Sequence, residues 1–225
     1  MSRFTRVAAW MDAELLVLGG VASSRAHVAH LSARGLVVVA LVCGALYGGV
    51  MGSWDLSDSQ RLLQVVYGAI KVPLMVAVST LLCLPGFIVL STILGLRHQL
   101  GRSLGAILAS QASFTIALVS LGPVTRFLYS SGLDHRGAIL MNGVMFALAT
   151  FIAQLVLRRR MRVLVREAPR QAIMLWVWGV LYVFVGIQMG WMMRPFIGTP
   201  GRPITFFREE PFSNAYMALI DIIAR

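Results

Sequence analysis

Five long runs of apolar residues, separated by short polar segments, dominate the pattern of this chain. The runs cover residues 36–53, 72–95, 104–127, 137–157 and 171–193. Each is close to the roughly 20 apolar residues that a helix needs to cross a hydrocarbon core about 30 Å thick. The pattern therefore predicts an all-α fold, a polytopic membrane bundle of about five transmembrane helices.

The second apolar stretch is longer than one crossing requires. It extends over residues 62–96 and is interrupted by Lys71, Pro73 and Pro85. We expect a short interfacial segment at 62–70, followed by the second span. Lys71 is then predicted at the water boundary, where its aliphatic stem can snorkel, and Pro85 is predicted to kink the helix.

The two ends of the chain differ from the spans in pattern. Residues 1–35 place apolar side chains at helical spacing with arginines elsewhere, which predicts a cytoplasmic amphipathic helix on the membrane surface. Residues 194–225 begin with a Pro- and Gly-rich stretch and end in SNAYMALIDII, a predicted short helix with Ser213 as its N-cap. We therefore expect three parts: 1–35, a five-helix domain at 36–193, and an extracytoplasmic tail at 194–225.

Small residues recur at every fourth position on three of the spans. On a helix this spacing makes a smooth groove where a second helix can approach closely, and the alternative is a merely flexible glycine-rich helix. We expect tight helix packing at Ala40, Gly44, Gly48, Gly52, Gly105, Ala109, Ser113, Ala117, Gly186 and Gly190.

Composition agrees with a membrane protein. Hydrophobic residues make up 58% of the chain and charged residues 13%, and the mean hydropathy is +0.78, whereas a soluble domain carries about 25% charged residues. The net charge of +11 is compatible with nucleic-acid binding, but the arginines flank apolar runs and form no single stripe. We expect membrane lipids as partners, together with other membrane subunits or a second copy of the chain, and no nucleic acid.

The arginines also predict an orientation. Segments 1–35, 97–103 and 158–170 are rich in arginine, whereas 54–61 and 128–136 carry aspartates against few arginines. Positive residues favour the cytoplasmic side of a membrane. The expected arrangement is a cytoplasmic N-terminus and a periplasmic or extracellular C-terminus.

Residues that carry chemistry are scarce inside the predicted spans. No Asp or Glu lies in any of them, all four histidines lie outside them, and Cys43 and Cys83 fall in the middle of apolar runs, where they act as small hydrophobes. The sequence has no nucleophile elbow, zinc-protease motif or phosphate-binding loop. We expect no catalytic residue, no metal and no cofactor, and hence no enzyme.

One polar set lies at matching depths near the predicted outer face: Lys71, Asn142, Gln188 and Arg194. One interpretation is a positively charged pocket in the outer leaflet that holds an anionic group or a lipid headgroup. The other is ordinary hydrogen bonding between helices combined with snorkelling, worth about 0.6–2 kcal/mol per bond.

Three segments carry a resemblance to known proteins: AIKVPLM at the start of span two, LLCLPGFIVLSTILG within it, and QMGWMMRPFIG at the end of span five. With the amphipathic N-terminal segment, they make the chain resemble poorly characterised bacterial five-span inner-membrane proteins that are loosely Yip1-like. The likeness covers roughly residues 36–210. It implies a bacterial inner (plasma) membrane protein without enzyme chemistry. The trafficking role of eukaryotic Yip1 proteins is not carried over, because their cytoplasmic motif is not evident here.

Three hypotheses of function follow. The first is a non-catalytic membrane subunit or scaffold of a larger complex. The second is a permease- or channel-type component for an anionic or lipidic solute, supported by the polar set around Lys71 and by the proline-broken second span. The third, an intramembrane enzyme, is disfavoured by the missing carboxylates and by the positions of the histidines.

Overall fold

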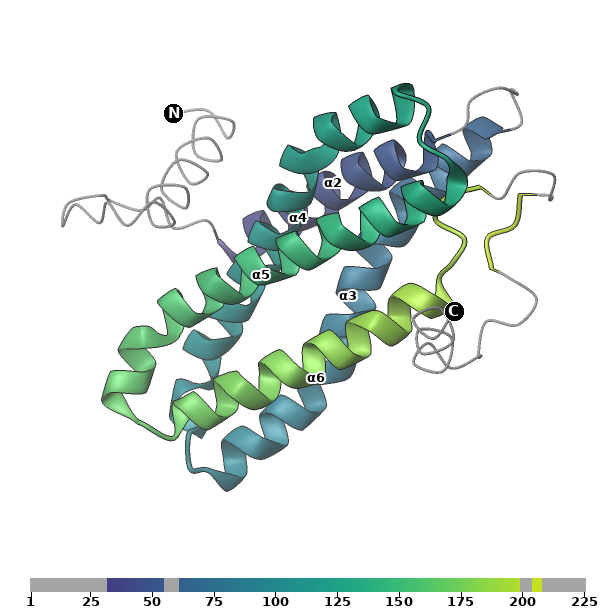
Figure 1. The fold of residues 1–225 in the computed structure, drawn as a ribbon. Coiled ribbons are helices and arrows are strands. Elements are labelled where there is room, and N and C mark those ends of the chain that lie inside the picture. The colour runs from purple at the N-terminus through teal and green to yellow at the C-terminus, as the bar shows by residue number, and fades with distance from the viewer. Residues whose placement is uncertain (1–31, 55–60, 199–203, 208–225) are drawn as a thin grey trace, which may run out of the picture.

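A computed structural model describes residues 32–54, 61–198 and 204–207, and in these residues the chain is all-helical (Figure 1). The elements are α2 (Ala33–Gly52), α3 (Leu62–Ile93), the 3-10 helix η2 (Arg97–Gln99), α4 (Leu100–Ser130), α5 (His135–Glu167) and α6 (Gln171–Met192). The five α-helices are long and apolar enough to cross a membrane. The predicted helical bundle is therefore confirmed, whereas the expected N-terminal amphipathic helix and C-terminal short helix lie outside the described residues.

Side chains cap the start of two of these helices, α2 and α5. The Ser32 hydroxyl accepts a hydrogen bond from the Gly35 N–H at the start of α2, and the Asp134 carboxylate accepts one from the Gly137 N–H at the start of α5. Gly95 and Gly132 adopt positive φ angles in the two connections that flank α4. Because these connections are short, consecutive helices lie antiparallel.

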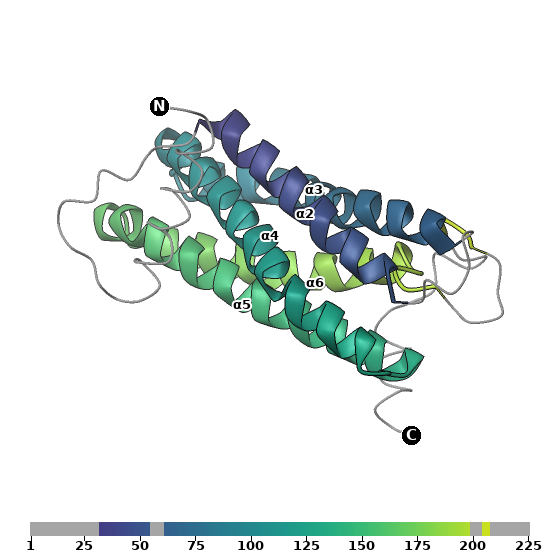
Figure 2. The same cartoon turned by 90° about the horizontal axis from the view of Figure 1, so that it is seen from above.

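The five helices pack side by side in a bundle, and each contacts a particular set of neighbours. Helix α2 packs against α3 and α4, α4 packs against α5, and α6 packs against α3 and, less extensively, against α5 (Figures 1 and 2). Helix α4 is the most enclosed. In its most apolar stretch of 18 residues 61% is buried, against 22–39% in the corresponding stretches of the other helices. The chain thus returns to α3 with its last helix.

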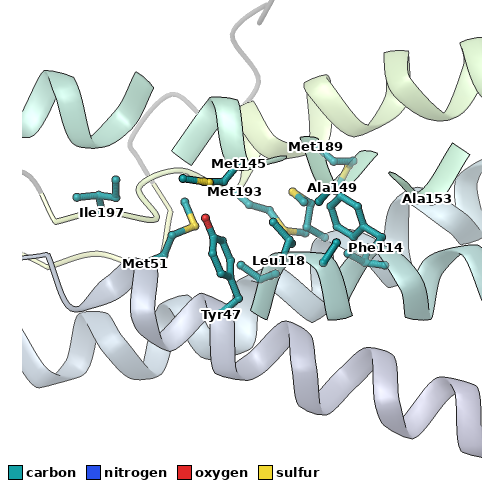
Figure 3. Close-up of a cluster of buried hydrophobic side chains, with 14 of the residues drawn as sticks. Tyr47, Met51, Phe114, Leu118, Met145, Ala149, Ala153, Met189, Met193 and Ile197 are labelled. Carbon is teal, nitrogen blue, oxygen red and sulfur yellow. The ribbon is translucent and has the colours of Figure 1, made fainter. Parts of the chain in front are cut away.

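Two clusters of buried side chains fill the interior. The first, here the Tyr47 core, contains many methionines, which adapt to irregular gaps (Figure 3); it includes Tyr47, Met51, Val72, Met75, Phe114, Leu118, Met145, Ala149, Met189, Met193 and Ile197. The second, here the Trp178 core, lies toward the opposite end of the bundle and includes Cys83, Phe87, Ile107, Leu157, Met161, Met174, Trp178 and Tyr182.

Helices α2 and α3 approach until their backbones touch. A Cβ atom on Gly48 would lie far inside contact distance of the Gly68 carbonyl oxygen, and one on Gly68 would meet the Gly48 carbonyl in the same way. One turn along α2, a Cβ on Gly52 would lie 2.5 Å from the Gln64 carbonyl oxygen. Glycine is required here because any side chain would push the two helices apart.

Large apolar side chains cover the outside of the bundle. Leu46 is 57% exposed, Phe151 63% and Trp176 66%, and similar residues lie on every helix. Such a surface is far more apolar than a soluble monomer presents to water. Together with the five long apolar helices, it marks the chain as a multi-pass integral membrane protein.

Helix α3 corrects the predicted break in the second span. The helix runs without interruption from Leu62 to Ile93, so the separate interfacial segment at 62–70 is wrong. Its 32 residues span about 48 Å. A helix longer than the hydrocarbon core is tolerated because it can tilt or extend beyond the core, and Pro73 and Pro85 both lie inside it.

Helix α5 also departs from the prediction, which ended the fourth span at residue 157 and placed a loop at 158–170. The helix instead continues to Glu167. The reason is visible in the run RRRMRVLVRE, where Met161 and Leu164 are spaced three residues apart and both are buried in the Trp178 core. With the arginines before, between and after them, these two residues make the end of the helix amphipathic.

Candidate functional site around Lys71

Lys71 lies inside the protein, with no exposed surface. Its ammonium Nζ donates a hydrogen bond of 2.7 Å to the carbonyl oxygen of Pro195. The predicted snorkelling of this side chain is therefore wrong, because the side chain points into the protein. The cause is the segment after α6, which returns over α3 and supplies a carbonyl acceptor.

Gln64 supports the same segment from the same face of α3. It precedes Lys71 by seven residues, about two helical turns, so the two side chains lie on one face. Its Nε2 donates to the carbonyl oxygens of Pro195 at 3.2 Å and Phe196 at 2.8 Å. These carbonyls follow the end of α6 at Met192, so they need partners from elsewhere.

Three aromatic rings surround the ammonium group. Its Nζ lies 4.8 Å from the ring centroid of Phe206 and 5.9 Å from those of Tyr67 and Phe196. The rings of Tyr67 and Phe206 also pack edge to face, with centroids 5.1 Å apart. A cation within about 6 Å of an aromatic face is attracted by the ring quadrupole. We call this group the Lys71 site: Gln64, Tyr67, Lys71, Pro195, Phe196 and Phe206.

Among the residues that the structure describes, no carboxylate pairs with Lys71. In the part of the chain that the structure describes, its contacts are one carbonyl and three rings, with no ion pair to a carboxylate. Gln64 Oε1 is buried beside it without a hydrogen-bond donor. An ammonium group has three N–H donors, and burial of a charge without a partner is costly. The site can therefore accept an anionic or hydrogen-bonding group.

Asn142, the second residue of the predicted polar set, is engaged elsewhere. Its Oδ1 accepts a hydrogen bond of 3.1 Å from the Tyr47 hydroxyl. Its Nδ2 donates to the Tyr129 hydroxyl and, at 2.7 Å, to the Ala138 carbonyl. The asparagine thus joins α2, α4 and α5 inside the bundle.

The other two members lie at the end of α6. The guanidinium carbon of Arg194 lies 3.1 Å from the ring centroid of Trp191, and Gln188 is half-buried on α6. The peptide bond that follows Arg194 is cis. Lys71 is thus bound to Pro195, the residue that follows Arg194. Asn142 is hydrogen-bonded to Tyr47 and Tyr129 instead.

The small residues of the predicted packing stripes differ in their surroundings. A Cβ built on Gly44 would lie 3.4 Å from Pro73 Cα, and one built on Gly190 would lie 3.7 Å from Met75 Sδ. Ala109, Ser113 and Ala117 are buried, and Ala40 is half-buried. By contrast, a Cβ on Gly105 or Gly186 would have no neighbour within 4 Å.

Several residues of these sites were not anticipated from the sequence. Tyr47 resembled an ordinary apolar member of the first span, Tyr129 fell in the predicted connection at 128–136, and Gln64 fell in the supposed interfacial segment. The seven-residue spacing of Gln64 and Lys71 was the available signal, since it places both polar groups on one face of a continuous helix. Nothing in the sequence pointed to Pro195 as an acceptor.

The described residues contain no group of three His, Cys, Asp or Glu side chains arranged to hold a metal ion. Comparison with known proteins found no matching family model, no matching curated protein and no matching solved structure. The Yip1-like resemblance therefore stays a prediction.

Proposed function

We propose that this protein is a non-catalytic integral membrane subunit or scaffold of a larger membrane complex. The observation that carries this proposal is the use of interior polar side chains to tie helices together. Besides the Asn142 bonds, the Tyr182 hydroxyl donates to Gln111 Oε1 at 2.7 Å and Gln171 Nε2 donates to Gln99 Oε1 at 2.9 Å. These polar side chains form hydrogen bonds between helices, and apolar side chains fill the space around them.

The lipid-facing side of α5 supports association with another membrane helix. Gly143 is exposed and a Cβ placed there would have no neighbour within 4 Å. Ala147, one turn further on, is also exposed. Beside them lie the exposed apolar side chains of Leu140, Val144 and Leu148. A small-residue face of this kind lets a second helix approach closely.

We place the protein in a bacterial inner membrane with its N-terminus in the cytoplasm, and the distribution of arginines supports this orientation. Arg34 lies in the first turn of α2, Arg97 begins η2, and Arg102 lies in the first turn of α4. Helix α5 ends in its arginine run at 158–166. The Arg102–Glu167 ion pair of 2.7 Å joins the start of α4 to the end of α5. One end of the bundle therefore carries most of the positive charge, as cytoplasmic ends do.

Native mass analysis of the protein extracted from its own membrane in a mild detergent tests the proposal. We expect a species heavier than the monomer, either a homo-oligomer or a complex with a co-purifying membrane protein. Gly143→Leu should shift the population to monomer, whereas Val144→Leu, an apolar change at the neighbouring exposed position, should not. A strictly monomeric wild-type protein with no co-purifying protein contradicts the proposal.

A second candidate function is a permease-type component for an anionic or lipidic solute. The observation in its favour is the buried Lys71, which has no carboxylate partner among the described residues and lies in the third turn of a proline-containing helix. In vesicles that contain the purified protein, Lys71→Gln should abolish flux of the solute. Arg136→Gln, which removes an exposed charge at the same end of the bundle, should leave it unchanged. Equal flux through wild type and Lys71→Gln rejects this candidate.

A further inference from the structure

A lateral groove runs between α2 and α4 near the ends of both helices. It is an open groove with a volume of about 360 Å³. Five of its six lining residues are apolar, and the sixth is an arginine: Leu46, Val50, Val119, Gly122, Pro123 and Arg126. Leu46 is more than half exposed, so the groove opens to the side, where a membrane protein meets lipid.

The sequence of α4 creates this groove. Gly122 has no side chain to fill the space beside α2, where a built Cβ would be 3.8 Å from Val50 Cγ2. Pro123 has no N–H, so it cannot donate the helical hydrogen bond to the Val119 carbonyl. The two residues together leave an apolar wall with one carbonyl that lacks its usual helical donor.

Arg126 stands at one end of the groove. Its Nη1 donates a hydrogen bond of 2.9 Å to the carbonyl oxygen of Ser53, the residue after α2. The side chain is otherwise exposed, and a guanidinium has five N–H donors in a planar fork. The bond to Ser53 fixes the guanidinium at the level where α2 ends, which leaves donors available for an anion.

We propose that this groove binds a phospholipid of the surrounding bilayer, with the phosphate at Arg126 and an acyl chain along Leu46, Val50 and Val119. The positions fit the two ends of such a molecule. Arg126 lies one turn before the end of α4 at Ser130, at headgroup level. Leu46 precedes Ser53 by seven residues, or about 10 Å along the helix, which places it in the hydrocarbon.

Charge complementarity selects this occupant. An apolar surface alone would accept any hydrocarbon, whereas the fixed guanidinium favours a phosphate, which it can bind through two parallel hydrogen bonds. A second copy of the chain would need to bring an anionic group to the same place. The inference does not depend on the proposed scaffold function, since a lone bundle would bind lipid in the same way.

The test is native mass spectrometry of the full-length protein in detergent, titrated with dioleoyl phosphatidylglycerol and, in parallel, with dioleoylglycerol, which lacks the phosphate. We expect one retained phosphatidylglycerol per chain. Arg126→Gln should weaken its binding about tenfold, as loss of hydrogen bonds to a charged group predicts. Arg126→Lys should weaken it less, because the charge remains while the fork is lost. Dioleoylglycerol should bind weakly and equally to wild type and Arg126→Gln.

Arg136→Gln is the matched control, because Arg136 is an exposed arginine at the same end of the bundle and does not line the groove. It should leave phosphatidylglycerol binding unchanged, and all three variants should keep the wild-type melting temperature. Equal binding by wild type and Arg126→Gln overturns the proposal. So does an equal loss with Arg136→Gln, or a protein dimer that Arg126→Gln dissociates while lipid binding is unaffected.

Discussion

The contact between Gly48 and Gly68 makes a sharp prediction for the variant Gly48→Ala. A methyl group at position 48 would overlap the Gly68 carbonyl oxygen and lie 3.1 Å from Ala69 Cα. Both neighbours are backbone atoms of α3, so neither can move by a change of side-chain rotamer. The added methyl group must therefore separate the two helices.

The size of the effect follows from the geometry. One turn away, a Cβ on Gly52 would be 2.5 Å from the Gln64 carbonyl oxygen, whereas a carbon–oxygen contact between helices is about 3.3–3.6 Å. A methyl group at position 52 thus needs roughly 1 Å of helix separation, and one at position 48, where the overlap is deeper, needs more. We expect Gly48→Ala to lower the free energy of unfolding by about 1–3 kcal/mol, the usual cost of forcing extra atoms into a packed core.

Gly49→Ala is the matched control, because its built Cβ would lie 3.7 Å from Val65 Cγ1, an ordinary contact. Both variants gain the same helix propensity of about 1 kcal/mol, so their difference isolates the overlap. The assay is unfolding in mixed micelles, followed by tryptophan fluorescence. The reasoning is refuted if Gly48→Ala is as stable as Gly49→Ala.

Three further predictions follow from the polar contacts. Lys71→Met removes the hydrogen bond to the segment after α6, so hydrogen exchange in residues 194–198 should rise while exchange in the five helices stays unchanged; equal protection contradicts the proposed anchoring. Asn142→Leu leaves the Tyr47 hydroxyl buried without its partner and should lower the free energy of unfolding in micelles by about 0.6–2 kcal/mol; full stability would show that the bond contributes nothing. Arg102→Gln breaks the ion pair to Glu167, but both side chains are about half exposed, so the melting temperature should not change.

The sequence was sufficient to predict the helical bundle, because a chain that crosses hydrocarbon must satisfy its own backbone hydrogen bonds. A helix of about 20 apolar residues does so, and such runs are visible in the sequence. The observed bounds of α2 and α6 agree with the predicted spans to within a few residues. The prediction failed where a helix exceeded the thickness of the bilayer. Length alone argued for a break before Lys71, and the run of arginines after residue 157 resembled a loop although its buried residues kept helical spacing.

The candidate site was harder to predict because its key acceptor comes from far along the chain. The carbonyl of Pro195 lies 124 residues from Lys71, and a backbone acceptor leaves no mark in the sequence. The depth of a residue along a span also says little about the direction of its side chain. Asn142 and Lys71 were placed at similar depths, yet Asn142 is held by Tyr47 and Tyr129.

Alternation of the helix connections across the membrane tests the account most directly. Single cysteines at His98, Ser131 and Pro169, in a background without Cys43 and Cys83, mark three successive connections. In intact cells a membrane-impermeant maleimide should label position 131, whereas positions 98 and 169 should react after the membrane is opened. Labelling of 98 and 131 from the same side would contradict a bundle that crosses the membrane with each long helix.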